Sequence, residues 1–294
     1  MVDARPFLCV FYSLAFASSA LAKPFDYDKH NAQYFASQAE KFFLQQSYEE
    51  AAASMEGAIK RDPTNPEYHS RRSDFLYLSQ DDDEEALKEI DRAIAMRKPP
   101  PPDYYSKKAG ILQRLHRCPE ALSQSSKVIA AKLAKITSKS SIEERKVLAF
   151  FYAQRAGIQS DLKHLQEAEN DLSQAVKFDP QSCDIHIHRA KISSELKHWP
   201  LVITDASVVI GADHRGSPVL RKREAYLLLA SAYAASKNFD KASNTYLTAL
   251  KECQDDRLVL RDAHKYFDST GNKKKAAEIK RNLDSLDEDF VPFK

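Results

Sequence analysis

The residues best suited to chemistry are Cys183, His186 and His188, which bring one thiol and two imidazole groups close together in the sequence. Zinc favours thiolate sulfur and imidazole nitrogen, and a structural zinc site needs four such ligands. On a helix, Cys183 and His186 share a face, whereas His188 points elsewhere. Two good ligands do not close a zinc site, so we expect no metal here and interpret the three side chains as part of helix packing.

A second candidate is the acidic run at residues 81–85, which could suggest calcium. The run lacks the alternating ligands and the turn glycine of an EF-hand loop. Negative charge is favourable at the N-terminus of a helix because of the helix dipole. We therefore interpret the run as a turn followed by the start of a helix.

No signature of a common enzyme class is present. The sequence contains none of the motifs G-x-S-x-G, H-E-x-x-H, G-x-x-x-x-G-K or G-x-G-x-x-G. Its 44 basic and 42 acidic residues give a formal net charge of +2, without the basic excess typical of nucleic-acid binders. We therefore expect no catalytic residue, no cofactor and no nucleic-acid partner.

The elements that carry these residues are predicted by a repeat. Ala51, Ala86 and Ala121 follow one another at intervals of 86−51 = 35 and 121−86 = 35 residues. Each precedes a second small or β-branched residue by seven positions, and such pairs recur along the chain: Ala51/Ala58, Ala86/Ala93, Ala121/Val128, Ala168/Ala175, Val202/Val209 and Ala242/Ala249. Self-similarity at this period is typical of stacked helix–turn–helix units. The sequence therefore predicts an all-α fold, an α-solenoid of antiparallel helix pairs.

Capping residues and prolines indicate where each helix pair begins and ends. They predict helix pairs over residues 31–62, 67–97, 104–134, 142–178, 184–210 and 217–251, followed by a diverged helical cap over 257–286. Two capping boxes, Ser47 to Glu50 and Ser141 to Glu144, predict helix starts. The four prolines at 99–102 favour a stiff polyproline spacer, with an SH3-type ligand as the alternative. Insertions are expected at 132–141 and 211–215.

The repeat resembles the tetratricopeptide repeat, whose signature is W-x2-L-G-x2-Y…A-x3-F…P. The best match is the run Leu229-Ala230-Ser231-Ala232-Tyr233 with Ala242, Tyr246 and Ala249, and the first unit matches through Ala39, Phe42, Ala51, Met55, Ala58 and Pro63. The resemblance covers residues 31–281, as about six units plus the C-terminal cap. In the second unit either Ser73 or Asp74 stands where alanine is usual, which leaves its register open by one residue.

The resemblance implies a superhelix whose concave groove, lined by the first helix of each pair, binds a segment of a partner protein. The first helices would then present a mixed apolar and basic set: Phe150, Ile187, Lys191, Leu227, Arg261 and Lys265. The alternative is that the apolar members are core and the basic members are ordinary solvated residues. A groove of this composition predicts a partner segment that carries acidic and apolar residues. The carboxylate clamp of chaperone-binding members is not expected, because Glu40 and Arg71 or Arg72 occupy its asparagine places.

The function predicted is therefore a protein-interaction scaffold. A holdase-type co-chaperone or assembly factor, which binds unfolded chains in the same groove, is the alternative. A scaffold should retain one or a few partners, whereas a holdase should protect several unrelated denatured proteins.

The N-terminus predicts export. After Arg5, the apolar run 7–22 ends in Ala20-Leu21-Ala22, an A-x-A site typical of a cleavable secretory signal. The alternative is an uncleaved anchor, but the run is shorter than the about 20 residues that span a bilayer as a helix. We expect residues 1–22 to be a signal peptide and 23–294 to be the solenoid, located in the periplasm, the endoplasmic reticulum lumen or outside the cell, without stable membrane insertion.

Protein recovered from its native compartment should accordingly begin at Lys23, because signal peptidase cleaves after the A-x-A site. N-terminal sequencing and intact mass would check this. A mature protein that still begins at Met1 and stays in membranes through carbonate washing would contradict it.

Overall fold

The computed structural model describes residues 31–80, 82–212 and 219–288. Within these ranges the regular structure consists of fourteen helices and no strand, which confirms the predicted all-α class. None of these helices is long and apolar enough to cross a bilayer. The predicted signal peptide and its cleavage site lie outside the described residues, as do residues 213–215 of the predicted insertion and the predicted helix start at Ser217-Pro218.

The helices form seven consecutive pairs. In chain order they are α1 (Ala32–Leu44) and α2 (Tyr48–Arg61), α3 (Pro66–Ser79) and α4 (Asp83–Met96), α5 (Pro102–Arg114) and α6 (Cys118–Leu133), α7 (Ile142–Asp161) and α8 (Leu165–Phe178), α9 (Cys183–Glu195) and α10 (Trp199–Gly211), α11 (Val219–Ala235) and α12 (Phe239–Glu252), and α13 (Arg257–Ser269) and α14 (Lys273–Glu288). The second helix of each pair also packs against the first helix of the next pair. The predicted C-terminal cap is therefore a complete seventh pair, in which Ala276 and Ile279 are buried.

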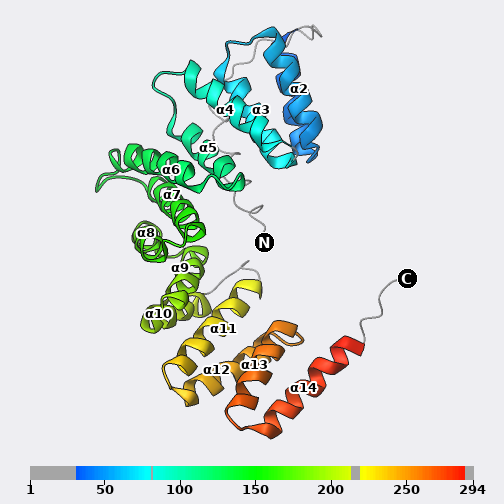
Figure 1. The fold of residues 1–294 in the computed structure, drawn as a ribbon, viewed down its shortest axis with the longest axis vertical. Helices are drawn as coiled ribbons and strands as arrows, with labels where there is room; N and C mark the ends of the chain where they lie inside the picture. Colours follow the sequence, from blue (N-terminus) through cyan, green and yellow to red (C-terminus); the bar gives the residue numbers. More distant parts are fainter. Residues whose placement is uncertain (1–30, 81, 213–218, 289–294) are drawn as a thin grey trace.

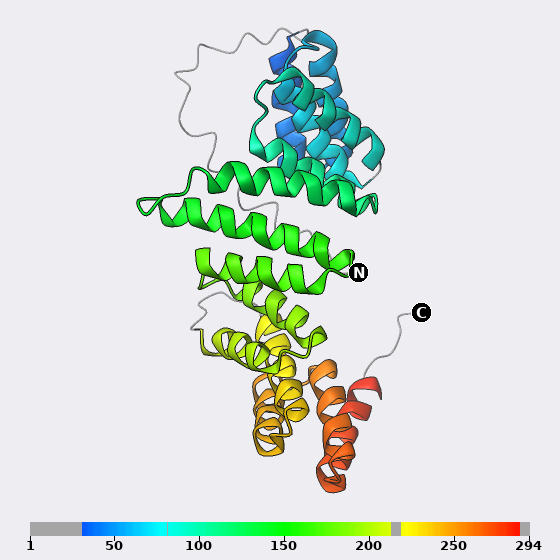
Figure 2. The same cartoon turned by 60° about the vertical axis from the view of Figure 1, so that its left-hand side comes forward.

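The pairs follow one another along an arc (Figure 1), with α7, α9 and α11 on its inner side and α8 and α10 on its outer side. Figure 2 shows that α6 and α7 lie side by side and that their connection projects beyond the neighbouring pairs. This projection contains the insertion predicted at 132–141. The polyproline spacer is shorter than predicted, because Pro102 is already the first residue of α5.

The same turn ends most of the first helices. Gln46, His116, Lys163, Lys197 and Lys237 have φ between 58° and 63°. The amide of the following residue donates to the carbonyl five residues back, as from Ser47 to Phe42 (2.9 Å) and from Asn238 to Tyr233 (2.8 Å). This is the Schellman arrangement, which satisfies carbonyls that the helix end leaves without partners. The seventh pair uses Gly271, with φ 83°. The connection between the two helices therefore starts with the same conformation in five of the described pairs.

The turn explains why one predicted capping box formed and the other did not. Ser141 accepts from the amide of Glu144 (3.1 Å) and its own amide donates to the Glu144 carboxylate (2.9 Å), so this box is confirmed. The box predicted at Ser47 is wrong, since that side chain caps nothing. The Ser47 amide is already bonded to Phe42 in the Schellman turn, so it cannot also receive the Glu50 side chain.

The repeated small residues are the points of closest helix contact. All twelve residues of the repeated pairs are fully buried, and so are the alanines that precede them on the first helices: Ala39, Ala109, Ala156, Ala190 and Ala230. In the second unit Ser73 takes this place. It lies seven residues before the left-handed Gln80, as Ala230 lies before Lys237. Its hydroxyl donates to the carbonyl of Ala86 (2.7 Å). Ser73 and Ala86 are 86−73 = 13 residues apart, whereas Ala230 and Ala242 are 242−230 = 12 apart, so the turn of this unit is one residue longer.

Replacing Ala230 with leucine should lower the free energy of unfolding by about 1–3 kcal/mol, because extra methylene groups cannot fit between α11 and α12. Urea denaturation followed by circular dichroism would measure it. The control is Lys237→Gly in the adjacent turn, where φ is 61°. Glycine adopts this conformation without strain, so the control should keep or increase stability. Equal losses at both sites would contradict the assigned packing.

Candidate interaction surface

Charged side chains connect the first helices of neighbouring units. On α3, Arg71 donates through Nε to Glu40 of α1 (2.8 Å). On α5, Lys107 donates to Asp74 of α3 (2.8 Å) and to Ser70 (2.7 Å). Burial raises the pKa of Asp74, and the nearby Lys107 and Arg71 oppose this shift. Buried or half-buried ion pairs therefore join the first helices of units one to three. These pairs neutralise the charges on this part of the helix faces.

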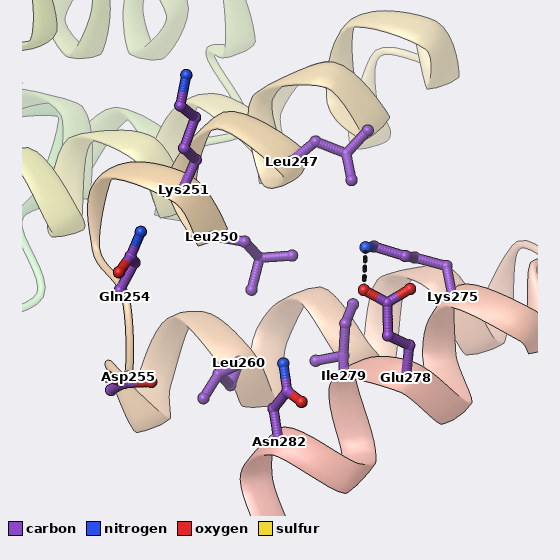
Figure 3. A pocket seen from close by; sticks show the side chains of 10 residues that line it. All are labelled: Leu247, Leu250, Lys251, Gln254, Asp255, Leu260, Lys275, Glu278, Ile279 and Asn282. Atoms are coloured by element: carbon purple, nitrogen blue, oxygen red, sulfur yellow. Dashed lines mark hydrogen bonds and ion pairs between the residues drawn. The ribbon is translucent and has the colours of Figure 1, made fainter.

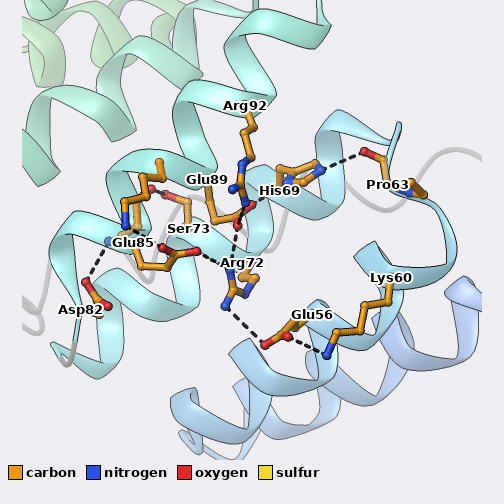
Figure 4. A network of polar contacts seen from close by, with 12 residues as sticks. Glu56, Lys60, Pro63, His69, Arg72, Ser73, Asp82, Glu85, Glu89 and Arg92 are labelled. Atoms are coloured by element: carbon orange, nitrogen blue, oxygen red, sulfur yellow. Dashed lines mark hydrogen bonds and ion pairs between the residues drawn. The ribbon is translucent and has the colours of Figure 1, made fainter.

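A second kind of network joins the two helices of a unit and, in the second unit, also reaches the preceding helix (Figure 4). On α3, the Arg72 guanidinium donates to Glu89 (2.7 Å) and Glu85 (3.1 Å) of α4 and lies 3.4 Å from Glu56 of α2. Nδ1 of His69 lies 2.5 Å from the same Glu89, and Nε2 lies 3.1 Å from the carbonyl of Pro63. Since Glu89 is almost fully buried, this network holds the first helix against the second rather than offering a site to a ligand.

The fifth unit repeats this arrangement. Nδ1 of His186 lies 2.7 Å from Asp205, and Nε2 lies 3.0 Å from the carbonyl of Pro180. Arg189 donates twice to the same carboxylate (2.8 and 2.7 Å). Both ring nitrogens of His186 therefore contact protein groups, so this histidine takes part in the packing of α9. In the described part of the chain, no three potential ligands gather into a metal site.

The surroundings of His186 set its protonation. Burial by itself lowers the pKa of this imidazole, but the hydrogen bonds to Asp205 and to the Pro180 carbonyl outweigh burial and raise the pKa above its usual value. Arg189 opposes the rise through its positive charge. The fold therefore favours the protonated form of His186, which pairs with a carboxylate of zero solvent exposure.

The residues predicted to line the groove fall into three environments. Lys191, Arg261 and Lys265 are exposed, and Lys191 lies 3.1 Å from Glu224 of α11. Phe150 and Leu227 are half-buried against the core clusters of their units. Ile187 is only 5% exposed and packs with Cys183, Ala206, Val209, Ala225 and Leu229. Its side chain therefore belongs to the core rather than to an accessible face.

The sequence predicted only part of an exposed stripe of residues on α13. Leu258, Arg261 and Lys265 follow one another at three and four residues, so they share one face of the helix. All three are exposed, Leu258 by 46%. The repeat pattern did indicate Arg261 and Lys265, but Leu258 could not be separated from a core leucine because both occur at the same helical spacing.

A cleft of about 390 Å³ opens between α12 and α14 (Figure 3). Leu247, Leu250, Leu260 and Ile279 supply its apolar wall. The polar part of the lining includes Lys275, which donates to Glu278 (2.7 Å). Beside this cleft, α13 packs less extensively against α12 than the corresponding helices of the other described units do.

Sequence models of the tetratricopeptide repeat match residues 37–102, 151–182 and 224–256. The chain therefore carries tetratricopeptide repeats in these ranges, as its resemblance implied. No curated protein matches the sequence.

Solved structures share the fold. The C-terminal part of a TPR repeat-containing protein from Cytophaga hutchinsonii has a TM-score of 0.68 at 15% identity, covering 86% of this chain and 95% of that one. Pseudomonas aeruginosa pilF has a TM-score of 0.59 at 11% identity, covering 81% and 97%. YrrB, a TPR protein with an unusual peptide-binding site, has a TM-score of 0.54 at 16% identity, covering 71% and 97%. At these identities the likeness shows that the chain is a tetratricopeptide-type solenoid.

Because the pKa of His186 is raised in the folded state, we expect the stability of the fold to depend on pH. A group whose pKa is higher in the folded state stabilises the fold fully below its unfolded pKa, and this contribution disappears as pH rises through the folded pKa. The stability advantage of the wild type over His186→Gln should therefore shrink as pH rises above about 6.5, the usual pKa of histidine. Denaturant melts at a series of pH values would measure it. Asp205→Asn should abolish the same dependence, and an advantage that grows with pH would contradict the assignment.

Proposed function

We propose that this protein is an exported scaffold that holds an acidic and apolar segment of a partner protein against the inner face of its first helices. The observation that carries the proposal is the stripe Leu258, Arg261 and Lys265 on α13. It presents two exposed cations beside an exposed leucine. In the first three units, by contrast, the cations that reach between first helices are paired with acids.

The composition of the stripe decides the chemistry of the partner. Complementary charge steers two proteins together and selects the partner, and buried apolar contacts supply most of the binding energy. The half-buried Phe150 and Leu227 extend the apolar character of the first helices toward the middle of the array. Lys191 contributes less positive charge because Glu224 neutralises it. Export rests on the Ala20-Leu21-Ala22 motif alone.

The fold comparison supports the class of function. YrrB is described as having a peptide-binding site, and PilW, with a TM-score of 0.58 at 16% identity, is described as a type IV pilus biogenesis factor. Assembly of a multiprotein structure is a setting in which a non-catalytic solenoid holds partners in place. We extend to this chain only the general role of binding a protein segment.

The double variant Arg261→Glu and Lys265→Glu should weaken capture of the partner at least tenfold, because it replaces attraction by repulsion. The wild-type complex should also weaken as salt rises, since exposed charges are screened over about 8 Å at physiological ionic strength. Partners captured by the wild-type chain from its native compartment would be identified, and their affinities measured by calorimetry.

The control is Lys274→Glu and Lys280→Glu, which changes the net charge equally at exposed positions of α14. It should bind as the wild type does, and both variants should keep the helical content. Full affinity of the α13 variant would place the binding surface elsewhere. Protection of several unrelated denatured proteins by the wild type, without a retained partner, would favour a holdase instead.

A further inference from the structure

Positive charge gathers on the connection between α6 and α7, which projects beyond the neighbouring pairs (Figure 2). It projects because α6 has 16 residues and α7 has 20, whereas both helices of the fifth unit have 13. Residues 132–146 contain five basic and two acidic residues, a formal charge of 5−2 = +3, while the whole chain has +2 and the remainder therefore 2−3 = −1. We propose that this projection binds the surface of a membrane rich in anionic phospholipids.

Three of the five cations keep their full charge. Lys132 lies 3.1 Å from Asp103, and Lys146 lies 3.4 Å from Glu143. Among the described residues, no carboxylate lies within ion-pair distance of the three other cations of the projection: Lys135, Lys139 and Arg145. The first two of these are exposed, so lipid phosphates can reach them. Anionic headgroups attract clusters of this kind.

Two large apolar side chains flank the same connection. Leu133 ends α6 and is 44% exposed, and Ile142 begins α7 and is 70% exposed. Neither belongs to the core cluster of its unit, whereas Ile136 between them packs against that cluster. Apolar side chains beside cations suit the boundary between headgroups and acyl chains, where the apolar groups leave water and the cations stay with the phosphates.

Hydrogen bonds hold the shape of the loop without using its lysine side chains. The Thr137 amide donates to Oγ of Ser140 (3.0 Å), and the Lys139 amide donates to Oγ1 of Thr137 (3.2 Å). The Arg145 guanidinium donates to the carbonyl of Ser138 (3.3 Å). A preformed surface loses little conformational freedom on binding, so the loop is ready to present its charges.

The shape and composition of the projection favour a lipid surface over a protein. Aromatic side chains seated in pockets supply much of the binding energy at protein interfaces, and residues 132–146 contain no aromatic residue. A bilayer requires no matching pocket, because its lipids rearrange around a projecting loop. The contact is reversible, since a few cations and two apolar side chains do not hold a protein as a spanning helix does.

Vesicle flotation would test the proposal on protein purified from its native compartment. The wild type should float with vesicles of three parts phosphatidylcholine and one part phosphatidylglycerol, and not with vesicles of phosphatidylcholine alone. Binding should fall as salt rises, because exposed charges are screened. Lys135→Glu with Lys139→Glu, the loop variant, should weaken binding at least tenfold at an unchanged melting temperature, since both side chains are exposed.

A fluorophore sensitive to its surroundings would show whether the apolar side chains enter the lipid. It would be attached to Ile142→Cys, because the described cysteines Cys118, Cys183 and Cys253 are buried and react slowly. Its emission should shift to the blue on the anionic vesicles. The same label on Lys274→Cys of α14 should not shift, and equal shifts at both positions would contradict binding through the projection.

The matched control is Lys274→Glu with Lys280→Glu, which makes the same change in net charge on α14. This control and Arg261→Glu with Lys265→Glu should both bind the vesicles as the wild type does. An equal loss in all three double variants would overturn the proposal, because net charge rather than the projection would then cause the attraction.

Wild-type binding by the loop variant would also overturn the proposal, as would equal binding to the neutral vesicles. Capture of an acidic protein through the loop lysines, without binding to vesicles, would assign the projection to a protein instead and overturn it as well. The loop variant should still capture the partner that the α13 stripe holds, so this proposal and the proposed function can each fail alone.

Discussion

Two helices can approach closely only where the side chains between them are small, and this constraint recurs in the first six units of the protein. One small residue on each first helix and two on each second helix are fully buried in the first six units. Their spacing sets where the helices of a pair cross and where the next pair stacks. Because each pair buries its apolar face only against its neighbours, the arc, its inner face and every candidate site depend on these contacts.

Two further devices keep the pairs uniform. A left-handed residue such as Gln46 or Lys237 turns the chain and satisfies carbonyls at the helix end. Buried acids, Glu89 in the second unit and Asp205 in the fifth, receive an arginine and a histidine from the preceding first helix. Removing one partner would leave a buried charge uncompensated, which is strongly destabilising. These groups therefore hold the first helices in place, and His69 and His186 take part in this packing.

The inner face is not uniform in charge. Its first three units pair their inter-helix cations with acids, whereas α13 exposes Arg261 and Lys265. Under the proposed function, a partner segment would place its acidic side chains near the C-terminal end of this face. These differences between units, rather than the repeat itself, would then select the partner.

The sequence by itself determined the all-α class, the helix pairs and the contact residues, because small residues at a 34–35-residue interval are a local record of helix packing. Only the tertiary structure decided the register of the second unit, where one extra turn residue selects Ser73, and the complete seventh pair. It also decided that Ile187 is core, since a shift of one residue rotates a helix face by about 100°.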